Sequence, residues 1–553
     1  MVKFTLSIVQ KEVLGLAFIM LPLFCYIFSQ LTFIIGYHLT PLVPILSIFL
    51  SALFVYRSNK RTPLCQVVLF CCIFFLCLII ATCWWDWSFD GTWYHADIQY
   101  QLAEKHYNPF FRWELADREM LAGCNSYFWS SYYPKGIETI SSCWVVLTHN
   151  LESGKATNLF FIFGLFFVLD SFVSSYEIAP KGIVKYLFLF IVIGNPVVFN
   201  QMLTNYIDWT SYIFLLIAII CVLKVFLLND RRYEFILYML FVLVINIKIN
   251  IAFWVCLFTM LLMISLVLIY KKKLSKDVNK LFFRSFFSIA IGFVLAFNPY
   301  VSNYILKGNI LYPLAGEDKM DIMTANIPKE IKDDGVFVMI NKSMALKTWM
   351  QAEDPSKSIV SKMLTQGYFD SRIGGFGLFF FEATIILLIL SFFSKVQLKM
   401  KCFVWGCLFV LYSSLFVLPS GWWARYVAYF YLSPILLLPL CYYAGRPGVY
   451  KHLFFIAVIL LVVNSGLSLI TSSYLGIINQ RNTERCLNYL QDIDTRGLIV
   501  QTPNALFLEK MKKRGIHYHR NNSLEEKRSL VTGGSPVYFD GVELPEYLVR
   551  RRK

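Results

Sequence analysis

The chain has 553 residues, of which 57% are hydrophobic and only 16% are charged, and its formal net charge is +16. This composition excludes an ordinary soluble globular protein, in which about 25% of residues are charged. The positive charge does not call for nucleic acid as a partner, because basic loops facing anionic membrane lipids account for it.

Long apolar runs recur along the chain, and a helix needs roughly 20 apolar residues to cross a bilayer. We predict thirteen membrane-spanning helices, near residues 12–35, 41–56, 64–83, 156–175, 183–199, 207–228, 234–247, 250–270, 281–299, 374–394, 402–418, 426–443 and 451–475. The sequence therefore predicts an all-α polytopic membrane protein.

Lysine and arginine predict which side of the membrane each connection faces. They gather in alternate connections, near 57–61, 181–185, 231–232, 271–280, 395–401 and 446–451. Cytoplasmic loops carry such an excess, so we expect the N-terminus inside the cell and, after an odd number of spans, the C-terminus outside.

Two long polar loops, 84–155 and 300–373, then fall on the outer side. The first holds five tryptophans, Trp84, Trp85, Trp87, Trp93 and Trp113. Aromatic rings with a polar edge favour headgroup depth, so we expect this loop to lie flat on the membrane as short amphipathic helices. The second loop has mixed charges and prolines, as a structured or lid-like loop would.

The tail, residues 476–553, changes character after the transmembrane domain of residues 1–475. A strand-like run at 497–501, a helical stretch at 504–513 and a second strand-like run at 516–519 follow one another. This pattern predicts a small extracytoplasmic α/β domain.

Acidic residues concentrate directly after the third predicted span. Asp86, Asp90, His95 and Asp97 lie within twelve residues, among aromatic side chains that can exclude water and shift pKa values. A carboxylate in such a place suits a general base, and Asp90 or Asp86 is the candidate. The structural alternative makes Asp90 a helix N-cap bonded to the amide of Trp93, with His95 and Asp97 solvated.

Charged residues at the outer ends of other spans are candidates for binding a phosphate. Arg425 stands in the outer turn GWWARY, where positive charge is disfavoured, and its planar fork suits a phosphate; the alternative is an interfacial anchor. Lys135 is a second phosphate candidate. Asp208 and Lys248 near two span ends either bind substrate or pair with each other.

The remaining polar pair closes the second outer loop. Asp370 and Arg372 precede Gly374-Gly375, either as a loop-closing pair or beside a lid hinge, and Arg372 is included among the substrate-binding candidates. The sequence shows no CxxC pair or His-rich tract, so no metal ligands are predicted, while the aspartates leave a divalent ion as an open question.

Several motifs carry a resemblance to a known superfamily: FDGTWYH (89–95), YPKG (133–136), NYIDW (205–209), NIKIN (246–250), NPYVSNYILKGNILYPLAG (298–316), DSRIGGFG (370–377) and GWWARY (421–426). With the many spans and the acidic first loop, the chain resembles the GT-C superfamily of membrane glycosyltransferases, in particular a group of bacterial proteins associated with surface polysaccharides.

The resemblance implies transfer of a sugar from a polyprenyl phosphate or diphosphate to a glycan or lipid-linked acceptor, outside the bacterial cytoplasmic membrane and with inversion. It implies an acidic first-loop residue, Asp90 or Asp86, as base. Two alternatives remain open: an O-antigen polymerase or ligase, and a flippase or exporter of lipid-linked sugars. Transporters tend to show internal repeats, and none is apparent here.

Overall fold

The computed structural model describes residues 6–59, 62–116, 119–121, 126–178, 182–270, 275–317, 319–351, 358–443, 448–493, 495–521 and 528–551. Parts of the basic connections used to predict topology, 60–61, 179–181, 271–274 and 444–447, lie outside the described residues.

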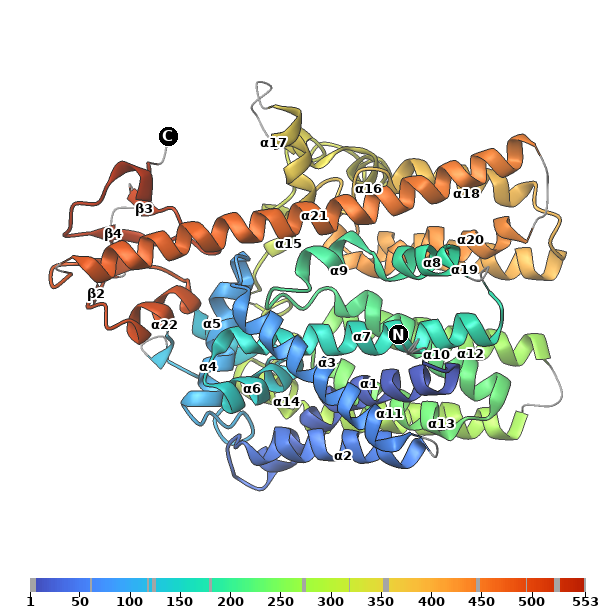
Figure 1. The fold of residues 1–553 in the computed structure, drawn as a ribbon, viewed down its shortest axis with the longest axis horizontal. Helices are drawn as coiled ribbons and strands as arrows, with labels where there is room; N and C mark the ends of the chain where they lie inside the picture. Colours follow the sequence, from blue (N-terminus) through green and yellow to red (C-terminus); the bar gives the residue numbers. More distant parts are fainter. Residues whose placement is uncertain are drawn as a thin grey trace.

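Helices, most of them long, make up most of the fold and lie side by side in one bundle (Figure 1). In chain order they are α1 (Ile8–Ile34), α2 (Leu42–Ser58), α3 (Pro63–Cys83), α7 (Ala156–Ser175), α8 (Ile183–Ile193), α9 (Pro196–Gln201), α10 (Thr210–Leu228), α11 (Arg231–Ile245), α12 (Ile249–Tyr270), α13 (Ser275–Leu295), α14 (Phe297–Lys307), α18 (Phe380–Phe392), α19 (Leu398–Val417), α20 (Leu432–Tyr442) and α21 (Val449–Asp492). A 3-10 helix, η6 (Ala424–Tyr431), leads into α20.

Seven helices of the described residues are long and apolar enough to cross a membrane, or eight if α13 and α14, which meet at 61°, form one broken span. The seven comprise α1, α3, η3 (Leu151–Lys155) with α7, α12, α19, η6 with α20, and α21. The chain is therefore a helical membrane protein. Several other predicted spans coincide with shorter apolar helices, such as α2, α8 and α18.

Helix breaks explain why the helices fall short of the predicted apolar runs. The run 183–199 is divided into α8 and α9, and Asn195 caps α9 while Pro196 occupies its first turn. Proline lacks the amide hydrogen that would continue a helix. The run 281–299 is bent where Asn298 leaves helical geometry before Pro299. Neither break can be recognised from hydropathy alone, because both runs are mostly apolar along their length.

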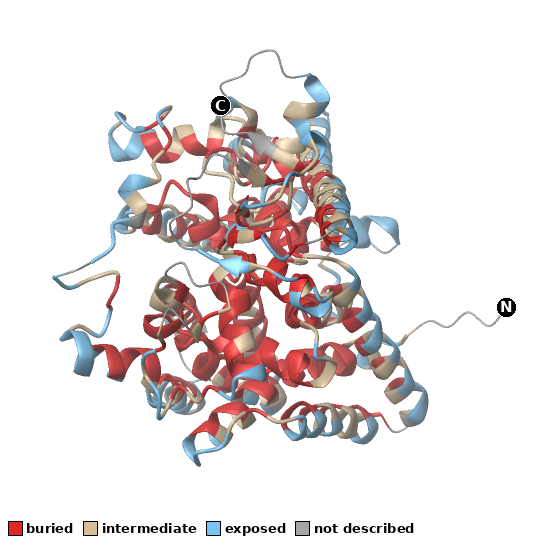
Figure 2. Cartoon of the chain, turned by 90° about the vertical axis from the view of Figure 1, so that its left-hand side faces the viewer, coloured by how far each residue is buried: buried red, intermediate tan, exposed pale blue. Residues whose placement is uncertain are grey.

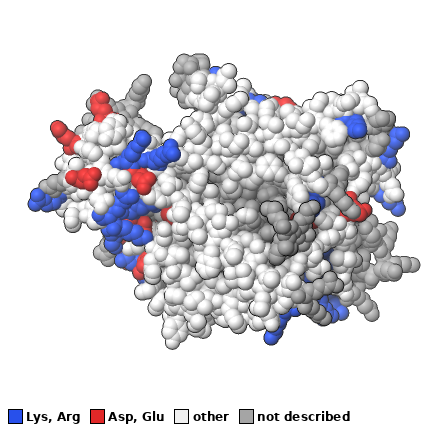
Figure 3. Space-filling view, viewed as in Figure 1, with Lys and Arg blue, Asp and Glu red and all other residues white. Residues whose placement is uncertain are grey.

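The surface of the bundle carries few charges in its middle. Figure 3 shows Lys and Arg gathered toward the two ends of this face, with a broad uncharged band between them. Buried residues lie mainly on the helices and segments in the interior, and exposed residues lie mainly at the periphery (Figure 2). Among the described helices, α1 and α7 share the most extensive contact, and a Cβ on Gly15 would lie 2.7 Å from the carbonyl oxygen of Gly164. Close backbone approach through small residues is typical of membrane helices.

The first outer loop packs into the protein instead of lying on the membrane. It forms η1 (Gly91–His95), α4 (Ala96–Glu104), α5 (Ser126–Tyr132), α6 (Gly136–Thr148) and η3 (Leu151–Lys155). Residues 136–146 of α6 are all buried, and none of the five tryptophans is exposed. The expectation of a flat interfacial loop was wrong, because an aromatic and apolar segment can equally bury itself against neighbouring helices.

The second outer loop is built of short helices joined by irregular segments. They are α15 (Ile322–Ala325), α16 (Val336–Ala345), η4 (Thr348–Gln351), α17 (Ile359–Leu364) and η5 (Thr365–Gly367). This loop leads directly to Asp370 and Arg372.

The tail follows the 44-residue helix α21, which runs along most of the long axis and ends at a small sheet (Figure 1). The elements are β1 (Ile499–Gln501), α22 (Ala505–Lys513), β2 (His519–Arg520), β3 (Arg528–Leu530), β4 (Tyr538–Asp540), η7 (Glu546–Leu548) and β5 (Val549–Arg551). The strand order is β2-β1-β4-β3-β5, with β1 and β2 parallel. The first predicted strand and the predicted helix are observed as β1 and α22, whereas the second predicted strand, 516–519, overlaps β2 only at His519.

Candidate functional site

An arginine from the start of η6 occupies the centre of a buried charge cluster. Nη1 of Arg425 lies 3.1 Å from Oδ2 of Asp90 and 3.8 Å from Oδ2 of Asp208. Its Nε lies 3.1 Å from Oδ1 of Asp370. One guanidinium thus faces carboxylates from the first outer loop, the start of α10 and the end of the second outer loop.

A second cation completes the cluster from the turn between α11 and α12. Nζ of Lys248 lies 2.6 Å from Oδ1 of Asp208, whose side chain is 2% exposed, and 4.2 Å from the ring centre of Tyr426. The predicted pair between these residues is therefore formed. It is joined to Arg425 through Asp208, so it is part of a larger network.

Arg372 lies at the edge of this network. Its guanidinium carbon is 5.5 Å from the ring centre of Trp423, and that of Arg425 is 4.5 Å from the same ring. The loop-closing pair suggested by the sequence is replaced by the contact of Asp370 with Arg425. Burial raises the pKa of the Asp370 carboxyl to about 6, and Arg425 offsets only part of this effect.

Aromatic side chains enclose the charged groups. The guanidinium carbon of Arg425 lies 5.3 Å from the ring centre of Tyr206 and 5.0 Å from that of Tyr426. Sequence reasoning missed these tyrosines, since 32 tyrosines are spread along the chain and none is distinguished by its local pattern. A shell of buried rings lowers the local dielectric, which strengthens the electrostatic interactions inside it.

Asp90 is held in a position unlike that of a helix cap. It precedes the π-turn η1, and its side chain makes no hydrogen bond to the turn's backbone. The N-cap alternative is thus not observed. The side chain is 20% exposed and points to Arg425, while its backbone N–H donates to the hydroxyl of Tyr206 at 3.4 Å.

Asp86, the second candidate base, has its carboxylate fully engaged elsewhere. Oδ2 accepts hydrogen bonds from the backbone and side-chain nitrogens of Asn205 at 2.7 and 3.0 Å. Oδ1 accepts from the backbone and hydroxyl of Ser88 at 2.8 and 2.6 Å. Burial raises the pKa of the Asp86 carboxyl. The two bonds from Asn205 fasten the first outer loop to the segment before α10, and the two from Ser88 hold the local turn, which favours a structural role.

His95 and Asp97 also make internal contacts. Nδ1 of His95 lies 2.5 Å from Oε1 of Glu138. The two carboxylate oxygens of Asp97 accept hydrogen bonds from the backbone of Leu121 and the hydroxyl of Ser126, each at 2.8 Å. Both side chains are buried, so the expectation that they are either solvated or in the site is replaced by a role in holding the loop together.

Lys135 bridges parts of the chain and makes no contact with the cluster. Its Nζ donates to the backbone oxygens of Ser131 and Tyr133 at 3.1 and 2.8 Å and to Oδ1 of Asn298 at 2.7 Å. Burial lowers the pKa of this ammonium to about 7. All three donors are used, which does not favour phosphate binding at this lysine.

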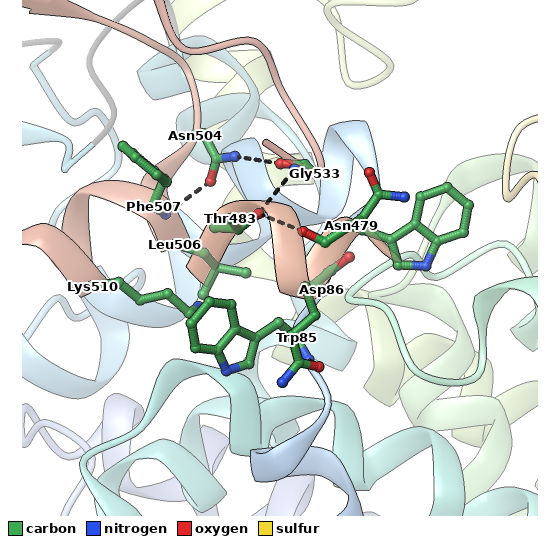
Figure 4. Close-up of a pocket in the computed structure, with 11 residues that line it drawn as sticks. Trp85, Asp86, Asn479, Thr483, Asn504, Leu506, Phe507, Lys510 and Gly533 are labelled. Carbon is green, nitrogen blue, oxygen red and sulfur yellow. Dashed lines mark hydrogen bonds between the residues drawn. The ribbon is translucent and has the colours of Figure 1, made fainter. Parts of the chain in front are cut away.

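The C-terminal domain contacts the segment that carries Asp90. The hydroxyl of Ser535 donates to the carbonyl of Phe89 at 2.8 Å, and its backbone N–H donates to the hydroxyl of Thr92 at 3.0 Å. Beside these contacts lies a small crevice where Lys510 of α22 extends over the ring of Trp85 at 4.8 Å (Figure 4). Lys510 also pairs with Glu152, which accepts from the backbone of Asp86.

Within the described ranges, no three His, Cys, Asp or Glu side chains are placed to hold a metal ion. The arrangement provides a partly accessible carboxylate beside three cations under an aromatic cover. Such a site can accept a proton and stabilise an anion in one place. Comparisons with protein-family models, curated proteins and solved structures found no match for the chain.

Proposed function

We propose that the chain is a membrane glycosyltransferase that moves a sugar from a polyprenyl phosphate or diphosphate to an acceptor hydroxyl on the extracytoplasmic side. The observation that carries the proposal is the contact of Asp90 with Arg425, joined by Asp208, Lys248 and Asp370. A base and a set of phosphate-binding cations are the two requirements of this reaction.

In the proposed reaction the acceptor oxygen attacks the anomeric carbon while the bond from that carbon to the phosphate oxygen breaks. The electron pair of this bond leaves with the phosphate, and the hydroxyl proton passes to Asp90. Arg425, Lys248 and Arg372 stabilise the charge that develops on the phosphate. A single displacement of this kind inverts the anomeric configuration.

The proposal includes the topology predicted from the sequence, with thirteen spans and the site on the outer face of a bacterial cytoplasmic membrane. The Lys and Arg distribution between alternate connections supports this orientation. The resemblance of the sequence motifs to GT-C glycosyltransferases supports the reaction class and an acceptor that belongs to a surface glycan.

The test uses the full chain in lipid nanodiscs and a panel of polyprenyl-phosphate and polyprenyl-diphosphate hexoses. Release of the sugar from the lipid is measured by mass spectrometry. Asp90→Asn should reduce turnover by roughly 10²- to 10⁴-fold, the usual contribution of a general base. Glu104→Gln is the matched control, because Glu104 belongs to the same loop and pairs with the exposed His149.

Unchanged turnover in Asp90→Asn would refute the role of this carboxylate. A chain that moves the intact lipid between leaflets, with no chemical change in it, would be a flippase, and the transferase proposal would then be withdrawn.

A further inference from the structure

Three helices of the outer side expose large apolar side chains. They are α14, which follows the bend after α13, and α16 and α17 of the second outer loop. The exposed side chains, called here the outer apolar face, are Val301, Tyr304, Ile305, Val336, Phe337, Val338, Ile359, Val360 and Met363. These side chains form separate patches, because α14 lies away from α16 and α17 in the bundle (Figure 1). Exposed apolar patches on a surface that faces water often mark an interaction site.

The helix α14 is turned with its polar side inward. Asn303 donates to the backbone oxygen of Tyr132 at 3.1 Å, and Asn298 accepts from Lys135 at 2.7 Å. On the opposite side Tyr304 and Ile305 are exposed. A surface helix in water has the reverse arrangement, with its apolar side toward the core. The inverted pattern indicates hydrocarbon on the outside.

Contacts with the spans place α16 at membrane depth. Phe337 stacks on Phe416 with ring centres 6.2 Å apart, and Nδ2 of Asn341 donates to the hydroxyl of Tyr412 at 2.7 Å. Tyr412 precedes the end of α19 at Val417 by five residues, or about 7.5 Å along the helix. The helix α16 thus lies beside the last turns of a span and not beyond it.

The segment of α17 lies next to a second span. Gly367 of η5, which directly follows α17, packs against the backbone of Thr471 and Ser472 in α21. A Cβ at this position would lie only 2.4 Å from the Ser472 nitrogen, so no larger residue would fit without a shift of the backbone. α21 begins at Val449, so these residues lie about 33 Å along the helix, at the outer limit of the hydrocarbon.

The other outer parts of the described chain do not share this property. In the first outer loop only Phe89 and Phe111 are exposed large apolar residues, and in the domain after α21 only Tyr547 is. The exposed apolar residues therefore follow depth in the membrane and are not a general feature of the loops. Lys307 and Lys342, partly exposed on α14 and α16, lie beside Glu114 and Asp334.

We infer that α14, α16 and α17 insert in the outer leaflet, and that the outer apolar face is covered by the acyl chains of bilayer lipids. Each of the three helices adjoins a membrane-spanning helix that itself exposes large apolar side chains: α14 follows α13, α16 contacts α19, and α17 contacts α21. This is the reason to assign lipid and not a protein as the occupant. This inference does not depend on the reaction proposed above.

Photo-crosslinking tests the inference in the full chain. Phe337, Tyr304 and Ile359 are replaced one at a time by p-benzoylphenylalanine, and the protein is placed in nanodiscs of phosphatidylethanolamine and phosphatidylglycerol with a few alkyne-bearing phospholipids. Phe286 of α13, 63% exposed, is the positive control for membrane depth. Tyr547, an aromatic residue 69% exposed on the C-terminal domain, is the matched negative control.

We expect lipid labelling at the three loop positions within about threefold of that at Phe286, and labelling at Tyr547 at least tenfold lower. Labelling at the loop positions as low as at Tyr547 would overturn the inference. So would cross-links to a second copy of the chain in place of lipid. Three separate positions keep the test decisive if one substituted chain does not fold.

Discussion

Replacing Arg425 by lysine separates the charge of this residue from its shape. Arginine contacts Asp90 through Nη1 and Asp370 through Nε, so its planar fork serves two carboxylates from different loops. A lysine ammonium is a point charge on a flexible stem and can meet only one of them closely. Asp208 keeps its contact with Lys248 at 2.6 Å in either case.

The size of the effect follows from these contacts. If Arg425 stabilises the leaving phosphate, losing the fork should lower turnover by about 10²- to 10³-fold, which is about 2.7–4 kcal/mol of transition-state stabilisation. Arg425→Lys should keep most of the stability of the fold. Arg425→Ala removes the charge and leaves Asp90 and Asp370 without their cation, and breaking a buried pair in this way costs about 3–5 kcal/mol.

Turnover with a lipid-linked sugar and thermal unfolding in detergent are measured together for both variants. Arg112→Lys is the control, since Arg112 is an outer-loop arginine that pairs with Glu119 on the surface. Arg425→Lys with wild-type turnover would refute the reasoning, because it would show that the reaction does not use the fork. A loss of stability equal to that of Arg425→Ala would assign the residue to the fold alone.

Two further predictions concern the other carboxylates. Asp86→Ala leaves buried donors of Ser88 and Asn205 unpaired, and we expect it to lower the free energy of unfolding by about 2–5 kcal/mol, measured by thermal or denaturant unfolding; unchanged stability would contradict the structural role. Asp370, with a pKa of about 6, is neutral below pH 6 and charged above it, where it competes with an anion for Arg425. Relative to Asp370→Asn, wild-type affinity for polyprenyl phosphate should therefore fall by about tenfold between pH 5 and pH 7.5, one pKa unit being about 1.4 kcal/mol. The phosphate itself also titrates in this range, and comparison with Asp370→Asn removes that contribution because it is the same for both proteins. Parallel pH profiles of affinity for the wild type and the variant would contradict the prediction.

Position at a membrane boundary was the signal that identified the charged cluster from sequence. Asp90, Asp208, Lys248 and Arg425 each stand at the outer end of an apolar run, where an unpaired charge is costly and must find a partner or a function. That argument selects residues but does not pair them. Asp370 contacts Arg425, 55 positions further along the chain, and not Arg372, which is two positions away. The reason is that the end of the second outer loop packs against the start of η6.

Hydropathy also could not show whether an apolar helix packs against protein or against lipid. The first outer loop and the outer apolar face both combine apolar and aromatic residues, yet α6 is buried in protein while α16 is exposed. An amphipathic pattern shows that one side avoids water, and either protein or lipid satisfies it. Only tertiary contacts decide between them, such as that of Gly136 with the backbone of Asn246.

Three separate parts of the chain hold Asp90 in position, and the C-terminal domain is one of them. Ser535 binds the backbone at Phe89 and the side chain of Thr92, on either side of Asp90. Tyr206 binds the amide of Asp90, and Arg425 its carboxylate. If Asp90 is the base proposed above, it must be held within a fraction of an ångström to act, and a loop alone rarely does so. The segment between β3 and β4 therefore supports the Asp90 segment, although it contributes none of the charges in the cluster.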